Sequence, residues 1–171
     1  MKKAIALVVS CLVLAVSVRA VEDDLDKQLE KLRSRIRFKA FKEKYESGQL
    51  KERGRRRSLG YVCGREWVEY DGMLEGWYES GAKKCEIPYK GGELDGVALN
   101  WFPSGKKKYI VAWKSGKKDG DFTVFYDSDV VSSRGRFSEG SLMVADFFDP
   151  SGKKVTREEW LAISGNRPFW N

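Results

Sequence analysis

Residues 95–118 read DGVALNWFPSGKKKYIVAWKSGKK, and this stretch predicts the fold of the chain. It holds two strand-like runs, residues 98–102 and 107–113, separated by Pro103-Ser104-Gly105 and followed by a second turn at residues 114–116. Glycine permits the positive φ angles that tight hairpins require, while Ser, Asp and Pro favour neighbouring turn positions. The stretch therefore predicts a β-hairpin.

The same pattern occurs three times without a gap, with a period of 24 residues. Asp71-Gly72, Asp95-Gly96 and Asp119-Gly120 open copies that span residues 71–94, 95–118 and 119–142, and a partial fourth copy spans residues 143–156. A fixed period of this length is typical of repeat proteins, whose units are too small to fold alone and share one apolar surface. The glycines expected at the turns are Gly72, Gly81, Gly92, Gly96, Gly105, Gly116, Gly120 and Gly140.

Aromatic residues recur at equivalent positions of the copies. They are Trp77, Tyr78, Trp101, Phe102, Phe125 and Tyr126 in the first runs, and Tyr89, Trp113 and Phe137 in the second runs. Alternation in the second runs places Cys85, Ile87 and Tyr89 toward the core, with Tyr109, Val111 and Trp113 in the next copy. Ser133 and Gly135 hold these positions in the third copy, so weaker packing is expected there. Adjacent aromatics of the first runs point to opposite faces, so one column is core and the other is either packed or an exposed ladder for a ligand.

The flanking segments predict helices. Leu25, Leu29, Leu32 and Ile36 recur at helical spacing, and Phe38, Phe41 and Tyr45 continue the pattern, so residues 22–46 are expected to form a charged amphipathic helix. This helix either packs on the domain of its own chain or makes a short coiled-coil contact with another helix. Thr156-Arg157-Glu158-Glu159 is a capping box that predicts a short C-terminal helix. The fold class is therefore mainly β, an antiparallel meander of stacked hairpins between two helices.

Four segments follow from these patterns. They are a signal peptide at residues 1–20, a charged helix and basic linker at residues 21–58, a repeat domain at residues 59–156, and a C-terminal helix and tail at residues 157–171. Residues 61–70 could add a first strand to the repeat domain.

Residues 1–20 have the layout of a secretory signal, with Lys2 and Lys3 before an apolar run and a small residue, Ala20, at the expected cleavage site. This predicts export to the periplasm or the medium. A membrane anchor is the alternative, although the run is shorter than the roughly 20 residues of a spanning helix. A lipoprotein cleaved before Cys11 is a further variant. Cleavage after Ala20 removes three positive charges, which reduces the formal net charge from +7 to +4.

Two features of the mature chain have two interpretations each. Arg53, Arg55, Arg56 and Arg57 form a basic cluster, either a solvated linker or a contact for an anionic membrane surface or acidic partner. Cys63 and Cys85 would pair in an oxidising compartment, but the meander separates them, so two free thiols are the alternative.

The composition excludes several kinds of active site. The chain has no histidine, so histidine triads and His-ligated metal sites are absent, and two mature cysteines cannot form a four-cysteine zinc site. No phosphate-binding loop occurs. Asp127 and Asp129 could act as an acid–base pair, but a hairpin tip favours exposed turn residues. Together with Asp119 they could bind calcium, although they lack the dense loop of oxygen ligands that calcium sites have. The chain is expected to be no enzyme and to need no cofactor.

Residues 101–106 (WFPSGK) and 113–120 (WKSGKKDG) resemble the MORN repeat, and more closely its variant in bacterial YwqK-type antitoxin proteins. The resemblance covers about residues 71–154. It implies hairpin stacks without catalytic residues that bind proteins and, in some relatives, phospholipids. The third copy departs from it, because Asp129 replaces the turn glycine.

Together these features predict a non-catalytic exported scaffold for an unidentified protein partner in the cell envelope, with no nucleic acid as partner. The alternatives are a basic adaptor for anionic lipid or polymer and an antitoxin that neutralises a toxin.

Overall fold

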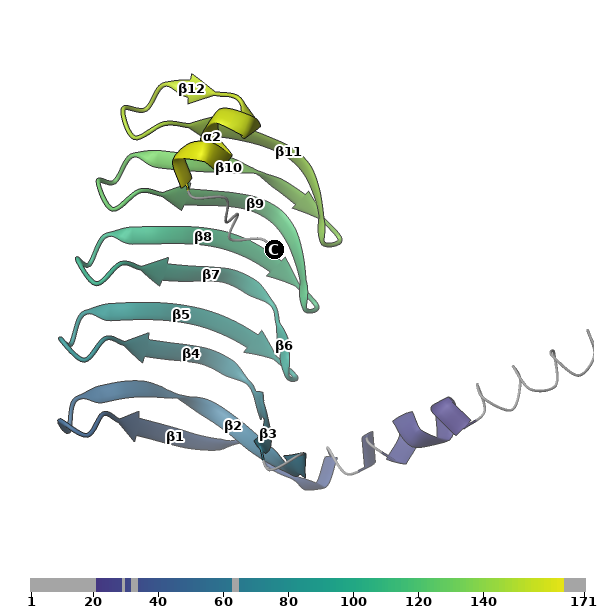
Figure 1. The fold of residues 1–171 in the computed structure, drawn as a ribbon. Coiled ribbons are helices and arrows are strands. Elements are labelled where there is room, and N and C mark those ends of the chain that lie inside the picture. The colour runs from purple at the N-terminus through teal and green to yellow at the C-terminus, as the bar shows by residue number, and fades with distance from the viewer. Residues whose placement is uncertain (1–20, 29, 32–33, 63–64, 165–171) are drawn as a thin grey trace, which may run out of the picture. The chain divides into compact units, whose positions relative to one another are not determined.

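The strands of this chain lie side by side in one open antiparallel sheet (Figure 1). The computed structural model describes residues 21–28, 30–31, 34–62 and 65–164. Among these residues the strand order is β1-β2-β4-β5-β7-β8-β9-β10-β11-β12, with β3 paired to β2 and β6 paired to β5. The predicted fold class, a mainly β meander with a short helix near each end, is confirmed.

The strands are β1 (Lys39–Lys44), β2 (Leu50–Val62), β3 (Arg65–Tyr70), β4 (Gly72–Trp77), β5 (Lys83–Lys90), β6 (Glu93–Leu94), β7 (Gly96–Trp101), β8 (Lys107–Lys114), β9 (Lys117–Phe125), β10 (Val131–Ser138), β11 (Ser141–Phe148) and β12 (Lys154–Val155). Helix α2 spans Arg157–Ser164. Residues 21–28, 30–31 and 34–35 are helical and belong to a unit that ends at residue 37, while the unit of the sheet begins with Phe38.

The hairpins share one register. Gly72 pairs with Tyr89 in one hairpin and Gly96 with Trp113 in the next. Each hairpin then has a β-bulge at the same place, which lets one residue of the second strand lie outside the pairing. The residues in this bulge are Lys51, Lys84, Lys108 and Ser132. Trp77, Trp101 and Phe125 occupy equivalent positions, since each pairs with the residue six positions later.

The tip of each hairpin has the same hydrogen bonds. The first residue of the turn donates its N–H to the carbonyl four residues later, over 2.8–2.9 Å, in turns that begin at Tyr45, Tyr78, Phe102, Tyr126 and Asp149. All eight glycines expected at turns have φ between 75° and 121°. Only glycine adopts this region at little cost. Ser115, Asp129 and Glu139 are the described non-glycine residues with positive φ, and all three lie in turns.

Tyrosine hydroxyls join each hairpin to the next. The hydroxyls of Tyr45, Tyr78 and Tyr126 donate to the main-chain carbonyls of Trp77, Trp101 and Phe148, each over 2.8 Å. Phe102 is the equivalent residue of the remaining hairpin and has no hydroxyl. There the Ser104 hydroxyl donates to the Asp127 carboxylate of the next turn instead.

The opposite ends of the hairpins are joined as well. The N–H groups of Gly92, Gly116 and Gly140 donate to carbonyls of the preceding hairpin, over 2.8–3.0 Å. The carboxylates of Asp71 and Asp95 accept N–H bonds from turns 20 residues later. Each hairpin is therefore fixed to its neighbour at both ends.

The core lies on one face of the sheet, which we call the core face. Val111, Phe122 and Phe137 form its centre, each no more than 3% exposed. Leu74, Cys85, Ala98 and Phe147 extend it along the stack. These residues alternate along their strands with residues of the opposite face, as an antiparallel sheet requires.

The third copy is not weakly packed, contrary to the expectation from Ser133 and Gly135. Gly135 pairs with Phe122, whose ring fills the space that a side chain would occupy. A Cβ atom at Gly135 would lie 2.0 Å from the carbonyl oxygen of Val144 and 2.8 Å from the Phe122 ring. Gly135 thus leaves room for the ring of Phe122, and this pair belongs to the centre of the core.

Helix α2 covers the last hairpins. Thr156 Oγ1 accepts the N–H of Glu159, and the Glu159 carboxylate accepts the N–H of Thr156, so the predicted capping box is present. Trp160 packs on Phe147 with ring centroids 5.1 Å apart and donates its indole N–H to Ser132. Ser132 occupies the bulge position that holds a lysine in three other hairpins, so the smaller residue makes room for the helix.

The expected helix at residues 22–46 is wrong beyond residue 35. Residues 39–44 form β1, which pairs with β2, and Tyr45 to Gln49 form a tip turn in which Gly48 has φ 86°. Apolar spacings of three and four residues suit a helix, but pairing with β2 places Phe41 beside Gly54 in the sheet. Tertiary contacts outweigh local periodicity here.

The basic linker and the single strand at residues 61–70 are also wrong. Residues 50–62 form β2, and residues 65–70 return as β3, so a hairpin is inserted between the first and second tip turns. Arg57 and Glu69 pair across this hairpin over 2.6 Å and are nearly buried. This ion pair stabilises the insertion, because a strand rich in arginine becomes suitable for a sheet once carboxylates face it.

The tyrosine bonds generate a stability prediction. Tyr78→Phe should lower the free energy of unfolding by about 1 kcal/mol, the typical value of one such hydrogen bond. Phe102→Tyr should raise stability, because it supplies the missing donor toward the next hairpin. Urea unfolding followed by circular dichroism measures both. Equal stability of Tyr78→Phe and the wild type would show that these bonds do not hold the stack.

Candidate interaction surface

The face opposite the core carries three rows of side chains, and we call it the open face. The tip row holds Trp77, Lys83, Trp101, Lys107 and Phe125. The middle row holds Arg53, Glu75, Glu86, Leu99, Ile110, Thr123, Arg134 and Asp146. The outer row holds Arg55, Met73, Pro88, Val97, Ala112, Asp121, Arg136 and Val144.

The centre of the open face is apolar. Val97 is 50% exposed and Met73 47%. Leu99 and Ile110 pair across β7 and β8 beside Val97 and are partly exposed. Exposed apolar side chains that adjoin in this way are uncommon on a monomer and mark contact surfaces.

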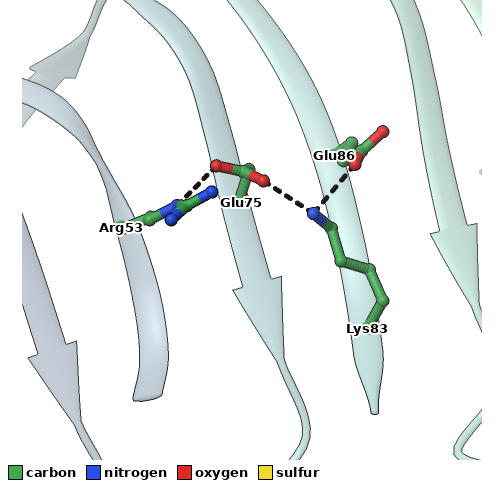
Figure 2. Close-up of polar contacts among 4 residues, drawn as sticks. All are labelled: Arg53, Glu75, Lys83 and Glu86. Carbon is green, nitrogen blue, oxygen red and sulfur yellow. Dashed lines mark hydrogen bonds and ion pairs between the residues drawn. The ribbon is translucent and has the colours of Figure 1, made fainter. Parts of the chain in front are cut away.

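A network of four charged side chains borders the centre on β2, β4 and β5 (Figure 2). Glu75 accepts bonds from Arg53 at 2.6 Å and Lys83 at 2.7 Å, and Lys83 also reaches Glu86 at 2.8 Å. Because Glu75 and Glu86 are direct cross-strand neighbours, their like charges would repel. Lys83 lies between them and removes this repulsion.

The network changes the pKa of Glu75 and contacts the ring of Trp77. Hydrogen bonds from Arg53 and then Lys83 lower the pKa of Glu75 to about 2. Arg53 and Lys83 also lie over the ring of Trp77, at 5.2 and 4.8 Å from its centroid. Trp77 thus contacts two cations at the rim of the open face.

The other end of the open face is charged as well. Arg136 makes two bonds to Asp121, at 2.7 and 3.1 Å, and Lys154 contacts Asp146 at 2.6 Å. Arg134 lies over the ring of Phe148. A depression of about 530 Å³ opens between these groups above Gly135. A second depression of about 430 Å³ lies above Gly54, which is the equivalent glycine of the first hairpin.

The predicted basic cluster is not a free positive patch. Arg53, Arg55, Arg56 and Arg57 all lie on β2, and each contacts a carboxylate. The partners, in that order, are Glu75, Asp71, Glu43 and Glu69. The sequence could not reveal this pairing, since the acids come from three other strands and one turn.

Neither aromatic column of the first runs belongs to the buried core. Trp77, Trp101 and Phe125 are partly exposed in the tip row, and Tyr78, Phe102 and Tyr126 are partly exposed at the turns. Lys51, Lys84 and Lys108 lie over the rings of Tyr45, Tyr78 and Phe102, at 5.6–5.9 Å. In the second runs Phe137 is buried, while Tyr89 and Trp113 are partly buried on the core face.

Cys85 is a free thiol in the core. Burial, and then the nearby charge of Glu52, raise its pKa, so it is a poor nucleophile. Cys63 lies outside the described residues, and the predicted bridge therefore stays a prediction. The signal peptide and the chain beyond Ser164 also lie outside them.

The described part of the chain offers no group of three or more His, Cys, Asp or Glu side chains that could hold a metal ion. Among the same residues, no helix is long and apolar enough to cross a membrane. Asp127 and Asp129 lie in the exposed fourth tip turn, which begins at Tyr126, and Asp129 has φ 68°.

The Glu75 network generates a pH prediction. A folded pKa near 2 lies below the ordinary value of 4.5, so this carboxylate contributes stability that is present above pH 4.5 and is lost as pH falls toward 2. Glu75→Gln should lower stability at neutral pH and reduce the acid-dependent loss in that window. Urea unfolding at several pH values measures it. Glu86→Gln, which leaves the Arg53 bond in place, is the control and should keep that loss; identical slopes for Glu75→Gln and the wild type would contradict the account.

Comparison with known proteins adds no assignment, since no family model, curated protein or solved structure matches this chain.

Proposed function

We propose that the protein is a non-catalytic, exported repeat scaffold that binds another protein in the cell envelope through the open face. The observation that carries this proposal is the exposed apolar centre formed by Met73, Val97, Leu99 and Ile110 between two charged ends. Protein contact surfaces commonly combine an apolar middle with a polar rim. The signal-like residues 1–20 support export.

The rigidity of the sheet supports the same function. Each hairpin is fixed to its neighbour by tip and corner hydrogen bonds, so the side chains of the open face hold their spacing. A preformed surface loses little conformational entropy when a partner binds. The resemblance to MORN repeats agrees with a binding role.

The alternative of a basic adaptor for anionic lipid has less support. Its main feature was the arginine cluster, and all four arginines contact carboxylates. Paired charges attract an anionic surface only weakly, since the field of each arginine is offset by its partner. No observation favours the antitoxin alternative over binding of another protein.

Site-specific photocrosslinking in the native host tests the proposal. A photoreactive amino acid at Val97 should give one or a few discrete protein adducts in the envelope fraction. The same amino acid at Met143, which is 64% exposed outside the three rows, is the matched control and should give none. Absence of any adduct from Val97, or equal adducts from both positions, would contradict binding through the open face.

A further inference from the structure

The order of charges along the open face points to a specific partner. In the middle row, the strands β2, β4, β7, β8, β10 and β11 carry Arg53, Glu75, Leu99, Ile110, Arg134 and Asp146. Read from β2, the signs are positive, negative, apolar, apolar, positive and negative. Read from β11, these four charges have the opposite sign at the same distance from the middle. Glu86 on β5 is the further charge of this row, and it corresponds to the neutral Thr123 on β9.

When this row is rotated by 180° onto the same row of a second copy, Arg53, Glu75, Arg134 and Asp146 each face an opposite charge, and Leu99 faces Ile110. We propose that the open face is the interface of a symmetric homodimer, in which two copies pack face to face about a two-fold axis between β7 and β8. The inference rests on the proposed function, because it names a second copy as the protein that binds the same face. A two-fold interface requires a surface that is complementary to itself, and this row meets the requirement.

The pairing across the axis can be derived strand by strand. An axis parallel to the strands places β7 over β8 of the second copy, β4 over β10, and β2 over β11. Leu99 then meets Ile110 of the second copy at the centre. Toward the ends, Glu75 meets Arg134 of the second copy, and Arg53 meets Asp146. The apolar side chains are desolvated in the middle, and opposite charges lie across from one another at both ends. Arg53, Glu75 and Asp146 already contact opposite charges of their own chain, so the second copy extends these ion pairs into networks rather than pairing free charges.

The tip row agrees with the same axis. Trp101 on β7 lies over Lys107 of the second copy, and Lys83 lies over Phe125. Cation and aromatic ring attract each other in such positions. The outer row agrees at its centre, where Val97 on β7 lies over Ala112 of the second copy, but farther out it places Met73 over Arg136 and Pro88 over Asp121. The middle and tip rows therefore set the register.

The shape of the sheet suits this packing. Strands β4 to β10 keep nearly the same direction across the stack in Figure 1. Sheets that pack face to face keep their strands roughly aligned, and an axis parallel to the strands gives this alignment. Helix α2 contacts Phe147 and Ser132 on the core face, so it does not occupy the proposed interface.

Charge reversal across the stack gives the sharpest test. Arg53 on β2 and Asp146 on β11 are seven strands apart in the sheet order, about 34 Å at 4.8 Å per strand, so they cannot touch within one chain. Arg53→Asp and Asp146→Arg should each weaken dimerisation about tenfold. The double variant should recover most of that loss, because each reversed charge again meets an opposite charge on the second copy.

Sedimentation equilibrium of residues 21–171 measures the dissociation constant, and circular dichroism verifies folding. The wild type should be a dimer at micromolar concentration. Val97→Arg should weaken it at least 100-fold, since it places two cations near the axis, whereas Met143→Arg should leave it unchanged. A monomeric wild type, or a double charge variant no tighter than the weaker single variant, would overturn the proposal.

Photocrosslinking separates this inference from the proposed function. An adduct at Val97 with twice the mass of the chain supports the homodimer. An adduct with a different protein alone would overturn the homodimer and leave the proposed function standing. No adduct at Val97 would count against both.

Discussion

The structure depends on contact between neighbouring hairpins, because no hairpin here could fold alone. Within a hairpin, β4 and β5 pair through six residue pairs. Between hairpins, β5 and β7 pair through two, β8 and β9 through five, and β10 and β11 through six. A two-stranded hairpin is marginal in water. The shared core face, the backbone pairing between hairpins and the tyrosine, glycine and aspartate bonds between turns therefore supply the stability that a single hairpin lacks.

Packing on the core face is balanced along the stack. Where the second strand carries glycine, at Gly54 and Gly135, the first strand carries Phe41 or Phe122. Where the second strand carries Val111, the first carries a smaller residue, Ala98, and Leu74 and Ile87 pair as residues of equal size. Large and small residues thus alternate so that each hairpin fills its own share of the core. The core therefore needs no side chain from the opposite face.

Much of the fold could be predicted from the 24-residue period, but the first hairpin could not. Its turn, Tyr45-Glu46-Ser47-Gly48, is identical to Tyr78-Glu79-Ser80-Gly81, yet the spacing is 33 residues because the β2–β3 hairpin is inserted. That identity is the signal that could have revealed it. The open face was harder to predict, because the bulges decide which residues share a row and only the strand register brings Arg53 to Glu75. Charge partners from distant strands have no local signature.

The central claim is that each unit becomes stable only beside its neighbours, and one measurement tests it directly. Amide hydrogen exchange of residues 95–118 is compared by NMR in an isolated peptide and in the folded chain. The account predicts slow exchange for β7 and β8 in the chain and unprotected amides with random-coil shifts in the peptide. A peptide with slowly exchanging amides and the native cross-strand pairs would show that the hairpin folds by itself, which would contradict the account.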